Sequence, residues 1–196
     1  SQRAAAFVLT AAMLITLTAP AFAETWYIEN GDITVKAGES GNDVTQNNVT
    51  TKNDTDTVIT NRHKDTASSN TVTIEAKDED DKVEVTLKDV NIDTSSRNKA
   101  AVSVTGEGDT NIKLNGDNAL KSDIYRSGIY GSGSLTISGG ENDSLTAQGG
   151  SGANGITSSG SLTISGGTVT ATGGNSTDSV GSGGSGIYSV SGDVTI

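Results

Sequence analysis

The sequence contains a nonapeptide, SGSLTISGG, that occurs twice, beginning at Ser132 and again at Ser159. The two copies start 27 residues apart, and the Gly-Ile pair that precedes each copy keeps the same spacing. A shorter match, SGIYSVSGDVTI, begins at Ser185. A tandem repeat of this length restricts the fold to architectures in which one unit stacks on the next, because a single unit of this size cannot bury its apolar face alone.

Each copy holds three short runs with strand character, separated by Gly, Ser and Asn. Within one run, Leu135 and Ile137 alternate with Ser and Thr, which is the period of a strand with one buried face. No segment after residue 23 has a helical period of useful length. The sequence therefore predicts an all-β fold, a parallel β-helix (a solenoid) of about 27 residues and three short strands per coil. An antiparallel meander of hairpins is the alternative.

In a parallel β-helix, equivalent residues of successive coils form ladders with a spacing of about 4.8 Å. Strand-like runs upstream of the clear repeats, TVTIEA from Thr71 and KVEVTLKDVNI from Lys82, would add earlier coils. We expect three interior ladders in the clear repeats: Ile129, Ile156 and Ile187; Leu135, Leu162 and Val194; and Ile137, Ile164 and Ile196.

The chain divides into three regions. Residues 1–23 have the pattern of a signal peptide, because Arg3 precedes an apolar run over residues 4–17 and Ala21 and Ala23 form a small-x-small peptidase motif. That run is short for a membrane anchor, and no later segment is long enough to span a membrane. Residues 24–70 are polar and less regular, and we expect a partly irregular N-terminal cap. Residues 71–196 are expected to form the β-helix, truncated at its C-terminus in mid-coil.

Cleavage before Glu24 would give a secreted protein, outside the cell or on its surface. Removal of Arg3 changes the formal net charge from −11 to −12. An acidic chain is a poor partner for nucleic acid and for anionic lipid, but its charge is compatible with neutral glycans and divalent cations. The chain has no Cys, so no disulfide framework stabilises it.

The sequence offers little for catalysis. The single His, His63, lies between two cations in a polar segment, and no Ser/His/Asp set or zinc motif surrounds it. Enzymes that cleave pectin need clustered carboxylates with a basic residue on one face. The nearest approach to such a set is in one coil region, where the residues are Lys113, Asp117, Lys121, Asp123 and Arg126. We therefore expect a protein that is not an enzyme, with a pectin-type lyase or hydrolase as a remaining alternative.

Two acidic segments are candidates for calcium. Residues 78–81 (DEDD) form the densest group, which is typical of a solvated turn between strands, and the segment lacks the spacing of an EF-hand loop. Glu141 and Asp143 are inserted at a corner between two strand-like runs. Because Ca²⁺ takes several oxygen ligands from flexible acidic segments, Glu141 and Asp143 are the candidate metal ligands. Calcium is the one cofactor that the sequence suggests.

The tyrosines are the strongest candidates for ligand binding. Tyr130 and Tyr188 each follow the inward Ile of a Gly-Ile pair, so both are expected to face outward on the same side, with Thr157 in the coil between them. Two coils correspond to about 9.6 Å, which is comparable to the disaccharide repeat of an extended polysaccharide. Exposed rings offer faces on which sugars stack. Tyr130, Thr157 and Tyr188 are therefore the candidate carbohydrate-binding residues. The alternative is that Tyr is simply a favourable strand residue on a half-exposed surface.

From about Thr71 onward the chain resembles a known family. The residues that carry the resemblance are KVEVTLKDVNIDTSSRNKAAVSV, TNIKLNGDNAL and the successive Gly-Ile coils GIYGSGSLTISGG, GITSSGSLTISGG and GIYSVSGDVTI. They are similar to bacterial secreted carbohydrate-binding domain-containing proteins, which are right-handed parallel β-helices related in shape to pectate lyases. The resemblance implies non-catalytic polysaccharide binding, often assisted by calcium and directed at acidic plant polysaccharides.

One departure from that family bears on calcium. Family members commonly carry an acid just before the Gly-Ile of each coil, whereas this chain has Ser127, Asn154 and Ser185 there. Gly/Ser/Thr-rich coils of this kind also occur in large surface adhesins. The sequence therefore predicts an exported, non-catalytic module that binds a polysaccharide or a cell-surface glycan. A structural or adhesive stalk of a larger surface protein is the alternative.

Overall fold

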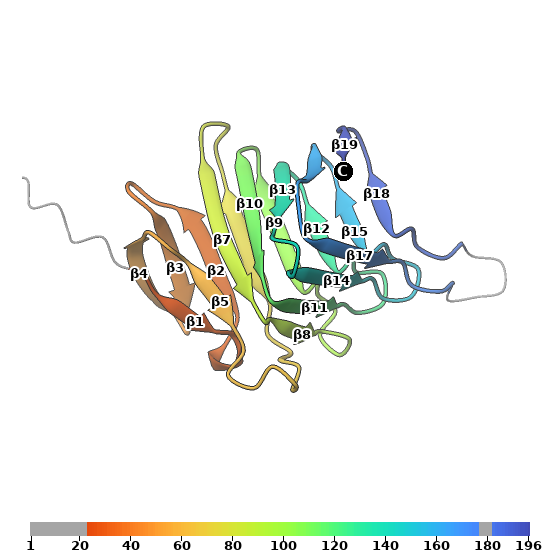
Figure 1. The fold of residues 1–196 in the computed structure, drawn as a ribbon, viewed down its shortest axis with the longest axis horizontal. Coiled ribbons are helices and arrows are strands. Elements are labelled where there is room, and N and C mark those ends of the chain that lie inside the picture. Colours follow the sequence, from red (N-terminus) through yellow and green to blue (C-terminus); the bar gives the residue numbers. More distant parts are fainter. Residues whose placement is uncertain (1–22, 177–181) are drawn as a thin grey trace, which may run out of the picture.

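The computed structural model describes residues 23–176 and 182–196. Apart from one short 3₁₀ helix, η1 (Ile28–Asn30), the regular elements in these ranges are β-strands that lie in three sheets (Figure 1). From β6 (Val72–Ala76) onward the chain passes through the three sheets in a repeating order, and each circuit is one coil. The parallel β-helix predicted from the repeat is therefore confirmed, with about five turns and a spacing of about 27 residues.

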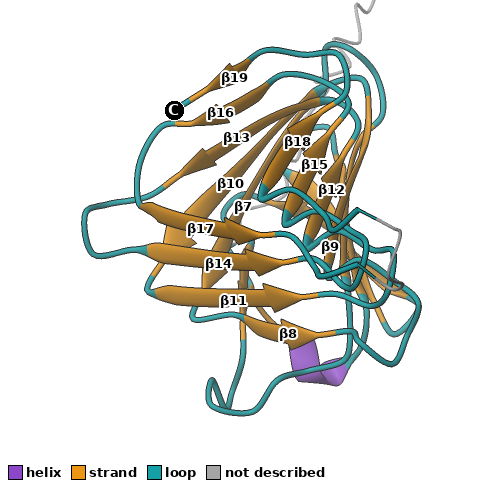
Figure 2. Cartoon of the chain, turned by 90° about the vertical axis from the view of Figure 1, so that its right-hand side faces the viewer, coloured by secondary structure: helices purple, strands orange, loops and turns teal. Residues whose placement is uncertain are grey.

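The three sheets are called A, B and C, and their strands are given in spatial order. Sheet A contains β18 (Ile187–Ser189), β15 (Ile156–Ser158), β12 (Ile129–Gly131), β9 (Val102–Gly106), β6 (Val72–Ala76), β2 (Ile33–Ala37), β3 (Asn42–Gln46) and β4 (Val49–Asp54). Sheet B contains β1 (Thr25–Tyr27), β5 (Val58–Thr60), β7 (Lys82–Lys88), β10 (Asp109–Asn115), β13 (Ser134–Ser138), β16 (Leu162–Ile164) and β19 (Val194–Thr195). Sheet C contains β17 (Thr168–Thr172), β14 (Ser144–Gln148), β11 (Asp117–Lys121) and β8 (Asn91–Asp93). Figure 2 looks at the end of the stack that carries β17, β18 and β19.

The parallel pairing reproduces most of the predicted ladders. Ile129 pairs with Ile156 and Ile156 with Ile187, and Leu135 pairs with Leu162 and Leu162 with Val194. In the third ladder Ile137 pairs with Ile164, but the expected last member, Ile196, lies beyond β19 and is 84% exposed. Val194 is also exposed, because within the described residues no further coil stacks on β19.

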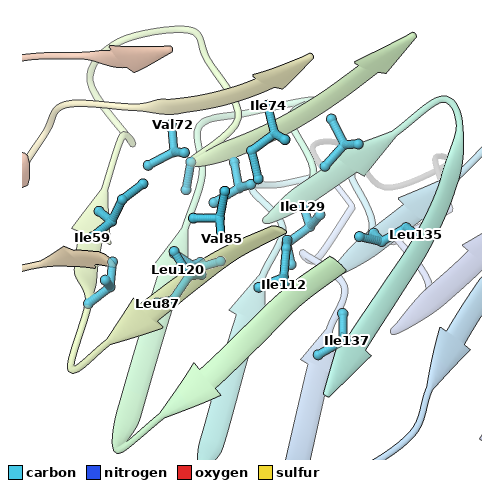
Figure 3. Packing of buried hydrophobic residues seen from close by; sticks show 14 of the residues in the cluster. Ile59, Val72, Ile74, Val85, Leu87, Ile112, Leu120, Ile129, Leu135 and Ile137 are labelled. Carbon is cyan, nitrogen blue, oxygen red and sulfur yellow. The ribbon is translucent and has the colours of Figure 1, made fainter. Parts of the chain in front are cut away.

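One hydrophobic core runs through the stack. It consists almost entirely of the inward-facing Val, Ile and Leu residues of the three sheets, and the burial pattern of β13 alternates as its sequence predicts. Figure 3 shows side chains of neighbouring coils, among them Val85, Ile112 and Ile137, packed in the interior. These three residues belong to one ladder and are each fully buried. Stacking therefore buries apolar faces that a single coil would leave in water.

The segment from Glu24 to Asn70 extends two of the sheets. β1 and β5 continue sheet B in parallel, while β2, β3 and β4 form an antiparallel run at one end of sheet A. Ile28, Ile33 and Ile59 from this segment belong to the common core. The antiparallel pairing expected under the alternative fold is thus found among the described strands only at this end of sheet A.

The predicted signal peptide, residues 1–23, lies outside the described residues except for Ala23. Over the ranges 23–176 and 182–196, no helix is long and apolar enough to cross a membrane.

Candidate functional site

The outward face of sheet A holds the candidate carbohydrate-binding residues. Tyr130 of β12 pairs with Thr157 of β15, which pairs with Tyr188 of β18, so the three residues occupy one ladder as predicted. The neighbouring strands that carry them lie side by side in Figure 2. Tyr130 and Tyr188 are 44% and 49% exposed, but Thr157 is only 8% exposed. The hydroxyl of Thr157 accepts a hydrogen bond from Asn154 Nδ2 at 2.9 Å and lies 2.7 Å from Ser127 Oγ.

The ladder continues in the opposite direction with small hydroxyl residues. Ser103 of β9 pairs with Tyr130, and Thr73 of β6 pairs with Ser103. Because Ser103 and Thr73 are small, the surface of sheet A beside Tyr130 is recessed relative to the Tyr130 ring. A groove of about 540 Å³ opens at this point, and it is lined by Thr71, Thr73, Asn98, Lys99, Ala100, Ser103, Tyr125, Arg126, Ser127, Tyr130 and Thr157. Tyr188 does not line this groove. The structure thus brings Tyr130 together with Tyr125, a combination that the ladder pattern alone did not indicate.

The charged residues that line the groove lie at the corners that connect sheet C to sheet A. Lys99 and Arg126 line the groove, whereas no Asp or Glu does. Lys99 Nζ lies 3.2 Å from Asp32 Oδ2. Arg126 donates from Nε to Asn98 Oδ1 at 3.1 Å. The groove therefore presents hydrogen-bond donors and hydroxyls beside two aromatic rings, which is a suitable lining for a polyhydroxylated ligand.

Asp32 anchors the corner cluster next to the groove. The guanidinium of Arg97 donates to both Asp32 oxygens, at 3.0 and 3.1 Å. Burial by itself raises the pKa of the Asp32 carboxyl, but the N–H of Thr71 and the cations of Lys99 and Arg97 outweigh it and hold the pKa below its ordinary value. Because Asp32 and Arg97 are 65 residues apart in sequence, this contact joins separate coils.

The predicted calcium ligands lie at the corner between β13 and β14. Asp143 accepts hydrogen bonds from the backbone N–H of Gly140 at 2.7 Å and of Gly116 at 2.8 Å. These two bonds lower the pKa of Asp143, and they occupy both of its oxygens with structural contacts. Glu141 is exposed in the same turn. Among the residues that the structure describes, no group of three or more His, Cys, Asp or Glu side chains is placed to hold a metal ion. The calcium site at Glu141 and Asp143 therefore stays a prediction.

The acidic run at residues 78–81 forms a tight turn between β6 and β7. Asp81 Oδ2 accepts the Asp78 N–H at 3.0 Å, and the Asp81 N–H donates to the Asp78 carbonyl at 2.9 Å. This geometry agrees with the interpretation of the run as a solvated turn.

The basic residues that a pectin-type enzyme would use lie on separate elements. Lys113 is on sheet B and pairs with Glu84 at 2.6 Å, whereas Lys121 is on sheet C and pairs with Asp93 at 3.0 Å. Arg126 lies at the corner beside the groove. These three cations therefore do not gather on one face with the carboxylates that such chemistry needs.

A second groove, which sequence reasoning missed, lies on the outward face of sheet B. It has a volume of about 700 Å³, and Tyr27, Thr60, Arg62 and Lys88 are among its lining residues. The guanidinium carbon of Arg62 lies 4.3 Å from the centroid of the Tyr27 ring, so a cation already covers one face of that ring. His63, next to Arg62, is exposed and donates its backbone N–H to Glu29.

No family model matches the chain, and neither a curated protein nor a solved structure matches it. The parallel β-solenoid is therefore established by the structure itself rather than by similarity.

Proposed function

We propose that this chain is an exported, non-catalytic module that binds a polysaccharide or a cell-surface glycan outside the cell. The observation that carries the proposal is the groove on the outward face of sheet A, where the exposed rings of Tyr125 and Tyr130 stand beside Ser and Thr hydroxyls. Aromatic faces contact the C–H faces of sugar rings, while hydroxyl, amide and guanidinium groups bond to sugar hydroxyls. The resemblance to secreted carbohydrate-binding β-helices supports the same function.

Export is supported by the first 23 residues. Arg3, the apolar run and the Ala21 and Ala23 motif have the order of a signal peptide. A non-catalytic role is supported by the separation of Lys113, Lys121 and Arg126 on different elements.

A structural or adhesive stalk is the second candidate, and the later coils favour it. On sheet B the outward ladder continues as Thr136, Thr163 and Thr195, and on sheet C Thr146 pairs with Thr170. These even rows of small hydroxyl side chains mark no single face for a ligand. The stalk and the binding module differ in one measurable property, which is retention by a glycan.

The test is affinity electrophoresis of the chain that begins at Glu24. We expect its migration to be retarded in a native gel that contains one of hydroxyethylcellulose, xylan, galactomannan or polygalacturonate, compared with a gel without polysaccharide. The same gel with EDTA tests the predicted calcium ligands Glu141 and Asp143: a loss of retardation would support a calcium-assisted site, and unchanged retardation would show that binding does not need the metal. Equal migration in all gels would favour the stalk. Release of reducing ends or unsaturated products would contradict the non-catalytic assignment.

A further inference from the structure

The corner that leads from sheet C into sheet A has the same unusual backbone in three successive coils. Asn98, Tyr125 and Gly152, each 27 residues after the last, have φ angles of 53°, 60° and 72°. This left-handed conformation is easy for Gly and tolerated by Asn, but it is unfavourable for a bulky side chain. Tyr125 is therefore strained at a position where the coils on either side carry residues that suit it.

The strained corner places an aromatic ring at the groove. Tyr125 is 66% exposed and lines the groove together with Tyr130. One edge of its ring lies against the next coil, since a Cβ added at Gly152 would be 3.0 Å from Cε1 and 3.2 Å from Cδ1 of Tyr125. The backbone N–H of Tyr125 donates to the Ser151 carbonyl at 3.0 Å. The ring is thus positioned by the corner of the following coil, where the small Gly152 leaves room for it.

We propose that Tyr125 is the principal binding residue of a glycan site, and that the site is the groove between Tyr125 and Tyr130 rather than the ladder from Tyr130 to Tyr188. This inference rests on the proposed function. The ligand is a pyranoside unit within a glycan chain, with its ring against Tyr125 and its hydroxyls toward Ser103 and Arg126. Strained backbone conformations cluster at binding and active sites. An Asn or Gly at this corner would relieve the strain but would place no aromatic ring at the groove.

The test compares two tyrosine variants of the chain that begins at Glu24. Tyr125→Asn introduces the residue found one coil earlier, so we expect an unfolding midpoint at least equal to that of the parent chain. We also expect its affinity for the polysaccharide that retards the parent chain to fall by about tenfold or more. Tyr188→Thr, which introduces the residue of the preceding ladder position, is the matched control, and its retention should be unchanged.

The outcomes separate the two levels of the proposal. Loss of retention in Tyr188→Thr with normal retention in Tyr125→Asn would place the site on the ladder and overturn the inference, while glycan binding itself would stand. A lowered midpoint in both Tyr125→Asn and Tyr125→Gly would show that Tyr125 serves the fold, which also overturns it. A parent chain that no polysaccharide retards would remove the proposed function together with the inference.

A different observation carries a second inference, at the other end of the stack. Asp54, the last residue of β4, is only 1% exposed. Its carboxylate accepts three neutral N–H groups, from Trp26 Nε1 at 2.9 Å, Glu24 N at 3.1 Å and Asp56 N at 3.3 Å. No Lys, Arg or His of the described residues lies within 4.0 Å in an ion pair with it. A buried carboxylate without a cation is costly.

Cleavage at the predicted peptidase site would supply that cation. The Glu24 nitrogen that donates to Asp54 is the atom that becomes the new α-ammonium when the bond after Ala23 is hydrolysed. The Glu24 carbonyl is held independently, because it accepts the Val58 N–H at 3.2 Å. We infer that removal of the signal peptide after Ala23 completes an ion pair between the Glu24 α-ammonium and the buried carboxylate of Asp54, so that correct processing stabilises the mature fold.

The experiment compares the chain that begins at Glu24 with one that begins at Phe22, each with and without Asp54→Asn. We expect the longer chain to unfold at a lower temperature, and the difference to vanish in the Asp54→Asn pair, as a double-mutant cycle requires. The Glu24 α-amine should also react several-fold more slowly with an acetylating reagent near pH 7 than the Phe22 α-amine, since pairing keeps it protonated. Equal midpoints and equal acetylation rates in the two parent chains would overturn the inference, and the acetylation comparison holds even if Asp54→Asn does not fold.

Discussion

Replacement of Gly106 by Ala is expected to destabilise the fold severely, because the added methyl group would collide with the backbone of the preceding coil. Gly106 ends β9 with a φ angle of 102°, in the left-handed region that strains other residues. A Cβ at this position would lie 1.8 Å from the Ala76 carbonyl oxygen and 2.9 Å from the Cα of Lys77. Both are backbone atoms, so neither can move aside as a flexible side chain would.

We expect Gly106→Ala to lower the free energy of unfolding by about 3 kcal/mol or more, which corresponds to a fall in the unfolding midpoint of about 6–12 °C for a chain of this size. Thermal unfolding followed by circular dichroism measures it. Gly131→Ala is the matched control, because its Cβ would meet only Leu135 and Thr157, at ordinary distances of 3.5 Å and more. Similar midpoints for the two variants would contradict the close approach of the coils at Gly106.

The second large effect is expected in the core. Ile112 is fully buried in the centre of sheet B, between Val85 of the preceding coil and Ile137 of the following coil. Ile112→Ala would remove three carbons at a site enclosed on both sides by stacked coils. Deletions of this kind cost about 2–5 kcal/mol, through lost burial and the cavity that remains. Urea unfolding of the variant measures the difference.

The control for Ile112 is its neighbour on the opposite side of the same strand. Lys113 pairs with Glu84, but their side chains are 49% and 54% exposed, and an exposed pair contributes at most about 1 kcal/mol. We therefore expect Lys113→Ala to lie close to the parent chain. Equal losses for the two variants would contradict the inward and outward alternation in β10.

The inward and outward residues of the same coils serve different purposes. The inward residues of β12 and β15 continue the core ladder, whereas the outward residues at equivalent positions change from Ser103 to Tyr130 to Thr157. Any selective binding must come from such differences, because the repeated inward residues are covered. The inward residues of the nonapeptide SGSLTISGG therefore serve the stack, and the proposed glycan recognition depends on residues outside it.

The residue pattern alone was enough to predict the interior of the coils. Strict alternation in β13 and the 27-residue spacing were enough to predict that Leu135 faces inward and stacks on Leu162. Both relations are local or periodic, since side chains of a strand alternate with a period of two and one coil pairs with the next in register. The outward ladder of Tyr130, Thr157 and Tyr188 was predicted from the same alternation and spacing.

The contacts at the corners and at the ends of the stack could be read only from the folded chain. The backbone of Tyr125 is in the left-handed region, and its side chain lines a groove with Tyr130. Arg97 forms an ion pair with Asp32 of another coil. Asp54 is buried and accepts a hydrogen bond from the Glu24 N–H. Corner segments differ in length and have no fixed side-chain period. Which of their side chains meet depends on backbone φ angles, and a pattern of apolar residues does not encode these angles. Ile196 continued the sequence pattern but is exposed, because burial in a solenoid depends on the coil above as well as on the residue itself.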